Sequence, residues 1–470
     1  MKTGSRHGSR LLVCLASGLI WALILVPAGN ATAPFVIENA DPGPAFVGLY
    51  SSLALDSQSH PHVAYYDDDD GNLKYTSRSG AGVWSREVAD GSANVVGLFS
   101  SLAIDALDAP HISYYDATNG QLWYAKKSGL IWSKQVVDAD GDVGVDNAIA
   151  IDPQGNPGIS YFDFTNHQSK YAHKSGGVWD TEAADASGEL TGHFTSLAYD
   201  QQGNPCISYY NETTHTLNYT RKTGGVWNRE APDNSGDNVG LFSSLKLDAQ
   251  DQPSISYYDA NNQDLKFAHK SGGVWQVEVA DGSDNDVGRD NGLALDMNGA
   301  PHITYYDNTN SHWLYTRKTG AVWDHLTIDD TDQNRGEFGS IAMDATGRPH
   351  ISCFDATGTK LLYAYGPVDA VAGVADPPNA ARPRLALYPN PSRGGAVHIR
   401  LSTGAAQASA VDIMDASGRR LRRLALDGSG AAEWDGRDAG GRPARAGIHY
   451  VRPIWRDGRN EPAERLVVLK

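Results

Sequence analysis

The stretch that decides the fold reads SSLAID at residues 100–105, PHISYYD at 110–116 and LWYAKKSG at 122–129, and Trp132 follows it. The same phrases recur along the chain every 47 or 48 residues. The period is marked by Trp84, Trp132, Trp179, Trp227, Trp275 and Trp323, and the phrase that opens with proline occurs seven times, at Pro61, Pro110, Pro157, Pro205, Pro253, Pro301 and Pro349. A constant period of this length is typical of a repeat architecture.

Each repeat contains four short runs rich in Ile, Val, Tyr and Trp, separated by Gly, Asn, Asp and Pro, which predicts four antiparallel strands joined by turns. Paired aromatics such as Tyr114 and Tyr115 point to opposite faces of a strand, so both faces need cover. Radial packing of blades covers both faces. The chain is therefore expected to be all-β, with a seven-bladed β-propeller over residues 34–366. An open solenoid is the alternative, but it would leave strand edges exposed.

The fourth strand of the seventh repeat is missing from its expected place after Tyr365. The chain has seven copies of the first three strands but only six copies of the tryptophan segment that forms the fourth. The N-terminal stretch PFVIENAD (34–41) aligns with VWSREVAD (83–90) and places Phe35 at the tryptophan position. We therefore expect an N-terminal strand to complete the last blade and to close the ring.

Charge is distributed unevenly along the 470 residues, whose formal net charge is -17. Residues 1–33 carry +3, residues 34–366 carry -25 and residues 367–470 carry +5. The acidic middle segment argues against nucleic acid or an anionic membrane surface as the main partner. This charge does not exclude cations or uncharged molecules as ligands.

The N-terminus has the layout of a secretory signal peptide. The apolar run LLVCLASGLIWALILV (11–26) follows Lys2, Arg6 and Arg10, and we expect cleavage after Ala31, so that residues 1–31 are removed and nothing stays inserted in the membrane. A single membrane anchor is the alternative. The two remaining cysteines, Cys206 and Cys353, fall in different repeats, so no disulfide framework is implied.

A second domain follows the repeats. Residues 367–383 have the composition of a flexible linker, and residues 384–470 alternate strand-like runs with turns such as DASG, WDG and AGG, which predicts a small β-sandwich. Four motifs stand in order there, LALYPNPSRGG (385–395), VDIMDASGRRLRRL (411–424), WDGRDAGGRPARAGIHYV (434–451) and RLVVLK (465–470).

These motifs resemble the C-terminal sorting domain of type IX secretion cargo and the related immunoglobulin-like module of flagellar hook-capping proteins. The repeats resemble those of bacterial secreted β-propellers. The resemblance implies an immunoglobulin-like fold for residues 384–470, recognition by the secretion machinery, and delivery to the outer surface or the medium of a Gram-negative bacterium. A plain structural β-module is the alternative for this domain.

No Ser-His-Asp set in a recognisable context, zinc motif, P-loop or dinucleotide fingerprint occurs in the sequence. An Asp stands six residues after each tryptophan position, as a turn-forming residue does. In the segment DADGD, Asp138, Asp140 and Asp142 offer alternating oxygens, so calcium stays open as a cofactor, although the terminal Glu of a full calcium loop is missing.

Departures from the repeat are the more informative signal. Most blades begin strand one with an aromatic followed by Ser or Thr, as in Tyr50 and Ser51, whereas two blades have an Asp and Asn pair, and nearby positions that are Leu or Val elsewhere carry His, Arg or Glu. These positions lie near the mouth of the central channel, so they are the candidate ligand-binding residues: Asp146, Asn147, His193, Arg289, Asp290, Asn291 and Glu337. A local ion pair, such as Arg289 with Glu337, is the alternative.

The sequence therefore predicts an exported binding module, on the cell surface or secreted, for a glycan or protein ligand. An extracellular hydrolase or lyase that uses the channel-mouth carboxylates and His193 is the competing hypothesis, and it requires these groups to converge within hydrogen-bond reach. A structural envelope protein without a ligand is the third.

Overall fold

The computed structural model describes residues 35–43, 46–329, 331, 333–366, 385–388, 397–401, 408–415, 419–427, 431–444, 447–455 and 464–468. The chain divides into two compact units, Met1–Asp369 and Ala370–Lys470. The predicted signal peptide (1–31) and linker (367–383) lie outside the described residues. Among the described residues, no helix is long and apolar enough to span a membrane.

The first unit contains seven four-stranded antiparallel sheets. Six are formed by four consecutive strands each: β2 (Val47–Leu55), β3 (Pro61–Asp67), β4 (Asn72–Arg78) and β5 (Trp84–Asp90); β6 (Val96–Ile104), β7 (Pro110–Asp116), β8 (Gln121–Ser128) and β9 (Ile131–Asp138); β10 (Val143–Ile151), β11 (Pro157–Asp163), β12 (Gln168–Ser175) and β13 (Val178–Ala183); β14 (Thr191–Tyr199), β15 (Pro205–Asn211), β16 (Thr216–Thr223) and β17 (Val226–Glu230); β18 (Val239–Leu247), β19 (Pro253–Asp259), β20 (Asp264–Ser271) and β21 (Val274–Asp281); β22 (Val287–Leu295), β23 (Pro301–Asp307), β24 (His312–Thr319) and β25 (Val322–Asp329).

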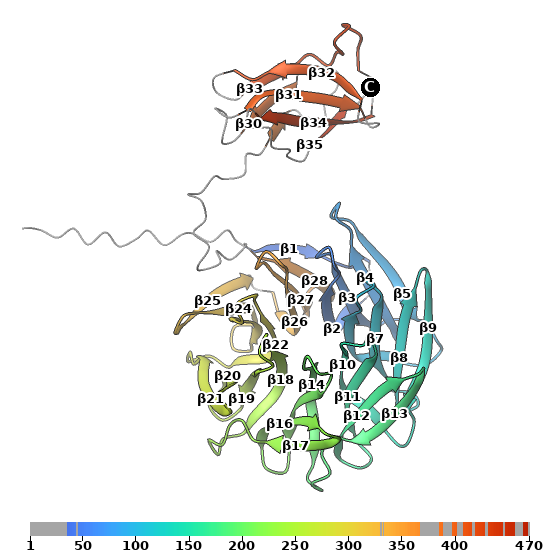
Figure 1. Cartoon of the computed structure of the whole chain (residues 1–470), viewed down its shortest axis with the longest axis vertical. Coiled ribbons are helices and arrows are strands. Elements are labelled where there is room, and N and C mark those ends of the chain that lie inside the picture. Colours follow the sequence, from blue (N-terminus) through green and yellow to red (C-terminus); the bar gives the residue numbers. More distant parts are fainter. Residues whose placement is uncertain are drawn as a thin grey trace, which may run out of the picture. The chain divides into compact units, whose positions relative to one another are not determined.

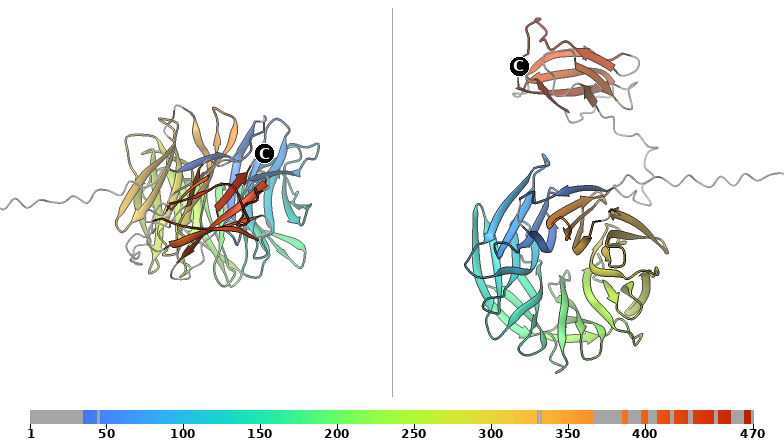
Figure 2. Two further views of the ribbon diagram at one scale, coloured as in Figure 1. Left: turned by 90° about the horizontal axis from the view of Figure 1, so that it is seen from above. Right: turned by 180° about the vertical axis from the view of Figure 1, so that it is seen from behind.

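The seventh sheet has the order β1-β28-β27-β26, built from β26 (Arg335–Met343), β27 (Pro349–Asp355), β28 (Lys360–Tyr365) and the N-terminal β1 (Val36–Asn39). The innermost strands β2, β6, β10, β14, β18, β22 and β26 each contact the next, and β26 contacts β2. The sheets are therefore blades around one axis, as Figures 1 and 2 show. The prediction of an all-β, seven-bladed propeller is confirmed.

Strand β1 is bonded to the last blade and contacts the first. It pairs antiparallel with β28, from Val36 opposite Tyr365 to Asn39 opposite Leu362. Glu38 accepts two hydrogen bonds of 2.8 Å from the Arg78 guanidinium and one of 3.0 Å from the Trp84 indole, both in the first blade.

The core lies between neighbouring blades. One cluster joins Leu73 and Tyr75 of the first blade to Ile112 and Tyr114 of the second, and every one of these side chains is buried. Each inner strand also carries a glycine near its start with φ between +105° and +115°. A Cβ at any of them would lie 2.7–3.1 Å from a Cα of the preceding blade's third strand, so only glycine fits: Gly48, Gly97, Gly144, Gly192, Gly240, Gly288 and Gly336.

The second unit contains two sheets. One has the order β29-β30-β33 and the other β32-β31-β34-β35, with bounds β29 (Leu385–Tyr388), β30 (Val397–Leu401), β31 (Ala408–Asp415), β32 (Arg420–Ala425), β33 (Ala431–Trp434), β34 (Gly447–Trp455) and β35 (Glu464–Val468). Val397 and Trp434 of the first sheet and Val411, Ile413 and Val451 of the second share one buried core. The two sheets therefore pack face to face.

The contacts of β1 predict the effect of removing it. A chain that begins at Phe46 loses the pairing with β28 and the bonds of Glu38, and each lost backbone hydrogen bond contributes about 0.5–1.5 kcal/mol net. We expect its melting temperature, measured by circular dichroism, to fall several degrees below that of a chain that begins at Pro34. The variant Glu38→Gln, which keeps the strand, should cost much less. Equal melting temperatures for the two chains would show that the ring does not depend on β1.

Candidate functional site

A β-bulge stands at the start of each inner strand. In the first blade, Leu49 pairs with Tyr66 and Ser52 with Ala64, so two residues, Tyr50 and Ser51, lie opposite one. The same register shift occurs in all seven inner strands. The first bulged residue has φ between +47° and +55° in every blade, a left-handed conformation that is strained for the aromatic residues and more readily adopted by Asp: Tyr50, Phe99, Asp146, Phe194, Phe242, Asp290 and Phe338.

These seven residues, each with the residue that follows it, line one cavity of about 220 Å³, which we call the channel mouth. The following residues are Ser51, Ser100, Asn147, Thr195, Ser243, Asn291 and Gly339. The repeated bulge thus brings side chains about 48 residues apart in sequence to a common cavity on the axis.

Aromatic rings form two arcs around the mouth. The ring of Tyr50 lies with its centroid 4.7 Å from both Phe99 and Phe338, which makes an arc of three. Phe194 and Phe242, also 4.7 Å apart, make an arc of two. In blade order Asp146 and Asp290 separate the two arcs. The mouth is therefore lined by aromatic rings, by hydroxyl and amide side chains, and by two carboxyl groups.

The structure brings Asp146 and His193 together, although they belong to neighbouring blades. The Asp146 carboxylate lies 2.9 Å from Nδ1 of His193 and accepts a 3.2 Å hydrogen bond from the backbone N–H of Phe194. The centroids of the His193 and Phe162 rings lie 3.9 Å apart, and Nε2 of His193 lies 3.9 Å from the Glu212 carboxylate. The sequence did not predict that Phe162 and Glu212 lie beside His193, because neither residue departs from its repeat in a way that indicates this contact.

Asp290 has different surroundings. It is partly buried, and burial together with the charge of Glu337 raises its pKa to about 7, although a hydrogen bond from the Phe338 backbone N–H and the charge of Arg289 act in the opposite direction. Glu337 itself accepts a 3.1 Å hydrogen bond from the Asn334 amide. Asp290 is thus a carboxyl group that gains or loses its proton near neutral pH.

The ion pair of Arg289 with Glu337, which the sequence allowed, does not form. The guanidinium of Arg289 instead binds Asp286 at 2.8 Å and lies over the Tyr258 ring, 5.3 Å from its centroid. Asp286 lies three residues before Arg289 at the start of the same strand, within easy reach of its side chain. Arg289 is therefore held by its own blade and by the one before it.

The two asparagines support the bulge. Asn147 donates to the Gly144 carbonyl at 3.0 Å and accepts from the Ser113 hydroxyl. Asn291 likewise donates to Gly288 at 2.9 Å and accepts from Ser256 at 2.5 Å. Each amide group thus uses one N–H to hold its own bulge and its oxygen to bind the preceding blade, and one further N–H is not used in these bonds.

The carboxylates of DADGD do not converge. Asp138 accepts from the Tyr161 hydroxyl at 2.7 Å and pairs with Lys170 at 2.5 Å, and Asp142 accepts from the Tyr115 hydroxyl at 2.7 Å. Within the described ranges, no group of three or more His, Cys, Asp or Glu side chains could hold a metal ion. Two of these carboxylates bind neighbouring strands, and calcium at Asp138, Asp140 and Asp142 stays an untested hypothesis.

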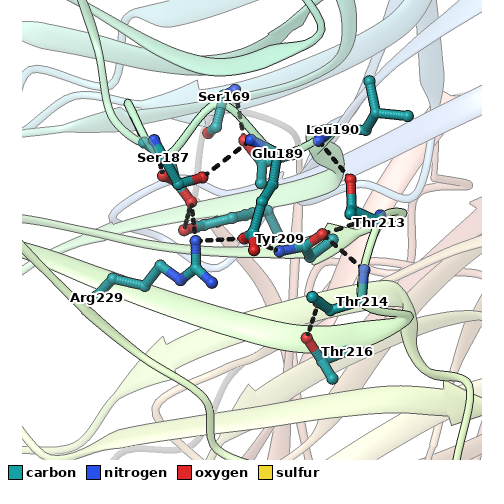
Figure 3. Close-up of polar contacts among 12 residues, drawn as sticks. Ser169, Ser187, Glu189, Leu190, Tyr209, Thr213, Thr214, Thr216 and Arg229 are labelled. Atoms are coloured by element: carbon teal, nitrogen blue, oxygen red, sulfur yellow. Dashed lines mark hydrogen bonds and ion pairs between the residues drawn. The ribbon is translucent and has the colours of Figure 1, made fainter.

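The recurring Asp after each tryptophan position anchors the next blade. In one case Tyr209 donates to Asp185 at 2.6 Å, while Arg229 binds Asp185 at 3.2 Å and Glu189 at 2.7 Å. Tyr209, Glu189 and Arg229 of this group are drawn in Figure 3. The same tyrosine-to-aspartate bond joins Tyr65 to Asp41, Tyr114 to Asp90, Tyr161 to Asp138, Tyr257 to Asp233 and Tyr305 to Asp281.

Among its described residues, the seventh blade has no tyrosine-to-aspartate bond and uses ion pairs of Arg335 instead. Cys353 stands where the other blades have the tyrosine, and Arg335 binds Asp329 and also Asp355, the latter at 3.0 Å. All seven aspartates also accept from the backbone N–H two residues on, as the turn interpretation predicted.

No protein-family model and no curated protein matches this chain. Several solved structures resemble it at low identity. An ulvan lyase described as a new polysaccharide lyase family shares 11% identity over 72% of this chain and 96% of its own, with a TM-score of 0.47. PorZ, a surface component of the type IX secretion system of Porphyromonas gingivalis, shares 11% over 89% of this chain and 74% of its own, with a TM-score of 0.38.

The intramolecular trans-sialidase from Ruminococcus gnavus shares 10% identity over 73% of this chain and 96% of its own, with a TM-score of 0.39. Likenesses at this distance do not bear on the ligand, so the function must be argued from the channel mouth itself.

The inter-blade aspartates predict how the ring responds to acid. Burial alone would raise the pKa of Asp233, but hydrogen bonds from Lys266 and Tyr257 hold it below its usual range. The stability that its ionised form contributes is therefore present above the unfolded-state pKa and is lost as the pH falls through the lower, folded-state pKa. In urea unfolding at pH 7 and pH 3, we expect Asp233→Asn to lower the free energy of unfolding at pH 7 by about 2 kcal/mol, because Lys266 loses its nearer carboxylate at 2.6 Å and keeps Asp259 at 3.5 Å. The substitution should also reduce the difference between the two pH values.

The exposed Asp284 offers a matched control, since Asp284→Asn should leave both values near those of the unaltered chain. A pH dependence that is unchanged in Asp233→Asn would contradict this account of the anchor.

Proposed function

We propose that the chain is an exported binding module, on the cell surface or secreted, and that its propeller binds a glycan at the channel mouth. The observation that carries the proposal is the cavity on the axis, walled by the aromatic arcs and interrupted by Asp146 and Asp290. An apolar, concave wall with a few placed polar groups is the usual form of a small-molecule site. The C–H face of a sugar ring can pack on the aromatic rings while its hydroxyl groups bind the carboxyl groups.

The size of the mouth limits what enters it. Its volume of about 220 Å³ lies below the range of roughly 300–1,000 Å³ that is typical of small-molecule pockets. One sugar unit, or the end of a chain, is therefore the occupant that fits, and the rest of a glycan would lie across the face of the propeller.

The architecture supports export. We infer that β1 closes the ring, that residues 1–31 are a signal peptide, and that residues 384–470 form an immunoglobulin-like type IX sorting domain that the secretion machinery of a Gram-negative bacterium recognises. The support is the pairing of β1 with β28, the shared core of the two C-terminal sheets, and the four sequence motifs that run through residues 385–470.

Glycan cleavage is a second candidate function, and two observations favour it. His193 contacts Asp146 through Nδ1, which leaves Nε2 for another partner, and the pKa of Asp290 of about 7 suits a group that exchanges a proton at neutral pH. Incubation of the glycans that bind with the chain, followed by analysis of the products, distinguishes a hydrolase or lyase from a binding module.

A double substitution tests the mouth. Asp290→Phe with Asn291→Ser gives this blade the pair found in the fifth blade, where Ser243 donates to the Phe194 carbonyl at 2.8 Å. We expect binding on a glycan array to be lost, because the carboxyl group is removed, and the melting temperature to stay within a few degrees, because the Ser has the same inter-blade acceptor available. Leu130→Ser, at an exposed turn between β8 and β9, is the control and should bind normally. Intact binding in the double variant would place the glycan elsewhere.

Truncation tests the sorting assignment. A chain that ends at Gly366 keeps every strand of the propeller and should fold, but in its native host it should accumulate in the periplasm. Fractionation with an antibody against the propeller measures this, with the full chain as control. Arrival of the truncated chain at the cell surface would show that the C-terminal unit is a structural module.

A further inference from the structure

The charges that line the channel mouth have one sign. Of the fourteen lining residues only Asp146 and Asp290 carry a carboxyl group, and none is Lys, Arg or His. The two nearest basic side chains are already engaged, His193 with Asp146 and Arg289 with Asp286. The cavity is therefore anionic at two points and aromatic between them.

Asp290 lacks a basic partner among the described residues. Asp116 and Asp307 are also buried without one, but both oxygens of each accept hydrogen bonds from backbone N–H and Asn amide groups. Asp290 instead accepts from the Phe338 backbone N–H. Asp138, Asp185 and Asp233 each have a basic side chain within 3.2 Å. No Lys, Arg or His of the described chain lies within 4.0 Å of the Asp290 carboxylate. A desolvated carboxylate without a cation is costly, and a cationic ligand would supply the missing partner.

The neighbouring rings suit the same ligand. Phe338 and Tyr50 follow Asp290 in blade order, and their centroids lie 4.7 Å apart in the arc of three. The face of an aromatic ring attracts a cation, and an ammonium group held between such faces and a carboxylate is a recurring mode of recognition. Arg289 cannot fill this role from within the chain, because its guanidinium lies over Tyr258.

We propose that the channel mouth binds a cationic ammonium group at Asp290, and that the glycan it takes carries free amines, as an amino sugar does. The identity of the glycan rests on the function proposed above, whereas the preference for a cation does not. The net charge of -25 over residues 34–366 favours the approach of cations to this unit.

The pKa of Asp290 supports the proposal. Burial and Glu337 raise it to about 7, and the other groups that face it are Arg289 and the hydroxyls of Tyr50 and Tyr306, whose own pKa values are raised by burial. The ionised fraction of Asp290 increases from about a tenth at pH 6 to about nine-tenths at pH 8. Affinity for a permanent cation should increase about tenfold over the same range.

Calorimetric titration of the chain from residue 32 to residue 470 tests the proposal with two matched pairs of probes. Choline is compared with its neutral isostere 3,3-dimethyl-1-butanol, and a glucosamine oligosaccharide with its N-acetylated counterpart. We expect the cationic member of each pair to bind about tenfold more tightly, a difference of about 1.4 kcal/mol. Asp290→Asn keeps an acceptor for the Phe338 N–H, and it should abolish both preferences and the pH dependence for choline, whereas Asp284→Asn should preserve all three.

The outcomes separate the two proposals. Preferential binding of choline without binding of either oligosaccharide would support the cation site and overturn the glycan function. Equal, Asp290-independent binding of both oligosaccharides would support a glycan function and overturn the cation site. Choline binding that is unchanged in Asp290→Asn, or no binding of any probe, would overturn the cation site as well.

Discussion

The spacing of the blades depends on a close approach between backbones. At the start of every inner strand a glycine with φ above +100° lies against the third strand of the preceding blade, so near that a Cβ would stand 2.7–3.1 Å from a Cα. A side chain at any of these positions would push two blades apart and open the ring. The bulged residue that faces the channel comes two positions later, as Tyr50 follows Gly48 and Asp290 follows Gly288, so the same contact sets the diameter of the channel mouth.

Polar anchors farther from the axis align the blades that the glycines space. The tyrosine-to-aspartate bonds lie within the packed sheets, and at the outer edge Glu87 accepts from the Lys127 ammonium at 2.5 Å and from the Trp132 indole at 3.1 Å. Asp290 differs from these anchors in both place and surroundings, because it lies on the bulge of an inner strand and lines the cavity, whereas an anchor such as Asp233 follows a fourth strand and pairs with a basic side chain.

The repeat in the sequence was sufficient to predict the number of blades, since the period of 47 or 48 residues and the strand-like phrases are local signals. The mouth residues could be found for the same reason, because Asp146 and Asp290 interrupt an otherwise constant aromatic position. The partners of these residues could not. The sequence offers Asp286 and Glu337 as acidic partners for Arg289. Only the three-dimensional arrangement of the side chains shows that Arg289 binds Asp286.

The sequence pattern could not predict that Asn147 and Asn291 support the bulge either. Their partners Ser113 and Ser256 lie about 35 residues away, in the preceding blade. The carboxylates of DADGD have the alternation of a calcium loop, yet Asp138 faces Tyr161 and Lys170 of the next blade. Periodicity places a residue on a strand and a face. It does not choose among acceptors that different blades present.

The central claim is that the departures at two blades turn a symmetric channel mouth into a ligand site. A crystal structure of the chain grown with a glucosamine oligosaccharide tests it most directly. The account predicts difference density for one sugar unit in the mouth, with its ammonium group at Asp290 and its ring against Phe338 or Tyr50. Density for the sugar on the opposite face or between the outer strands, with the mouth holding only water, would contradict it.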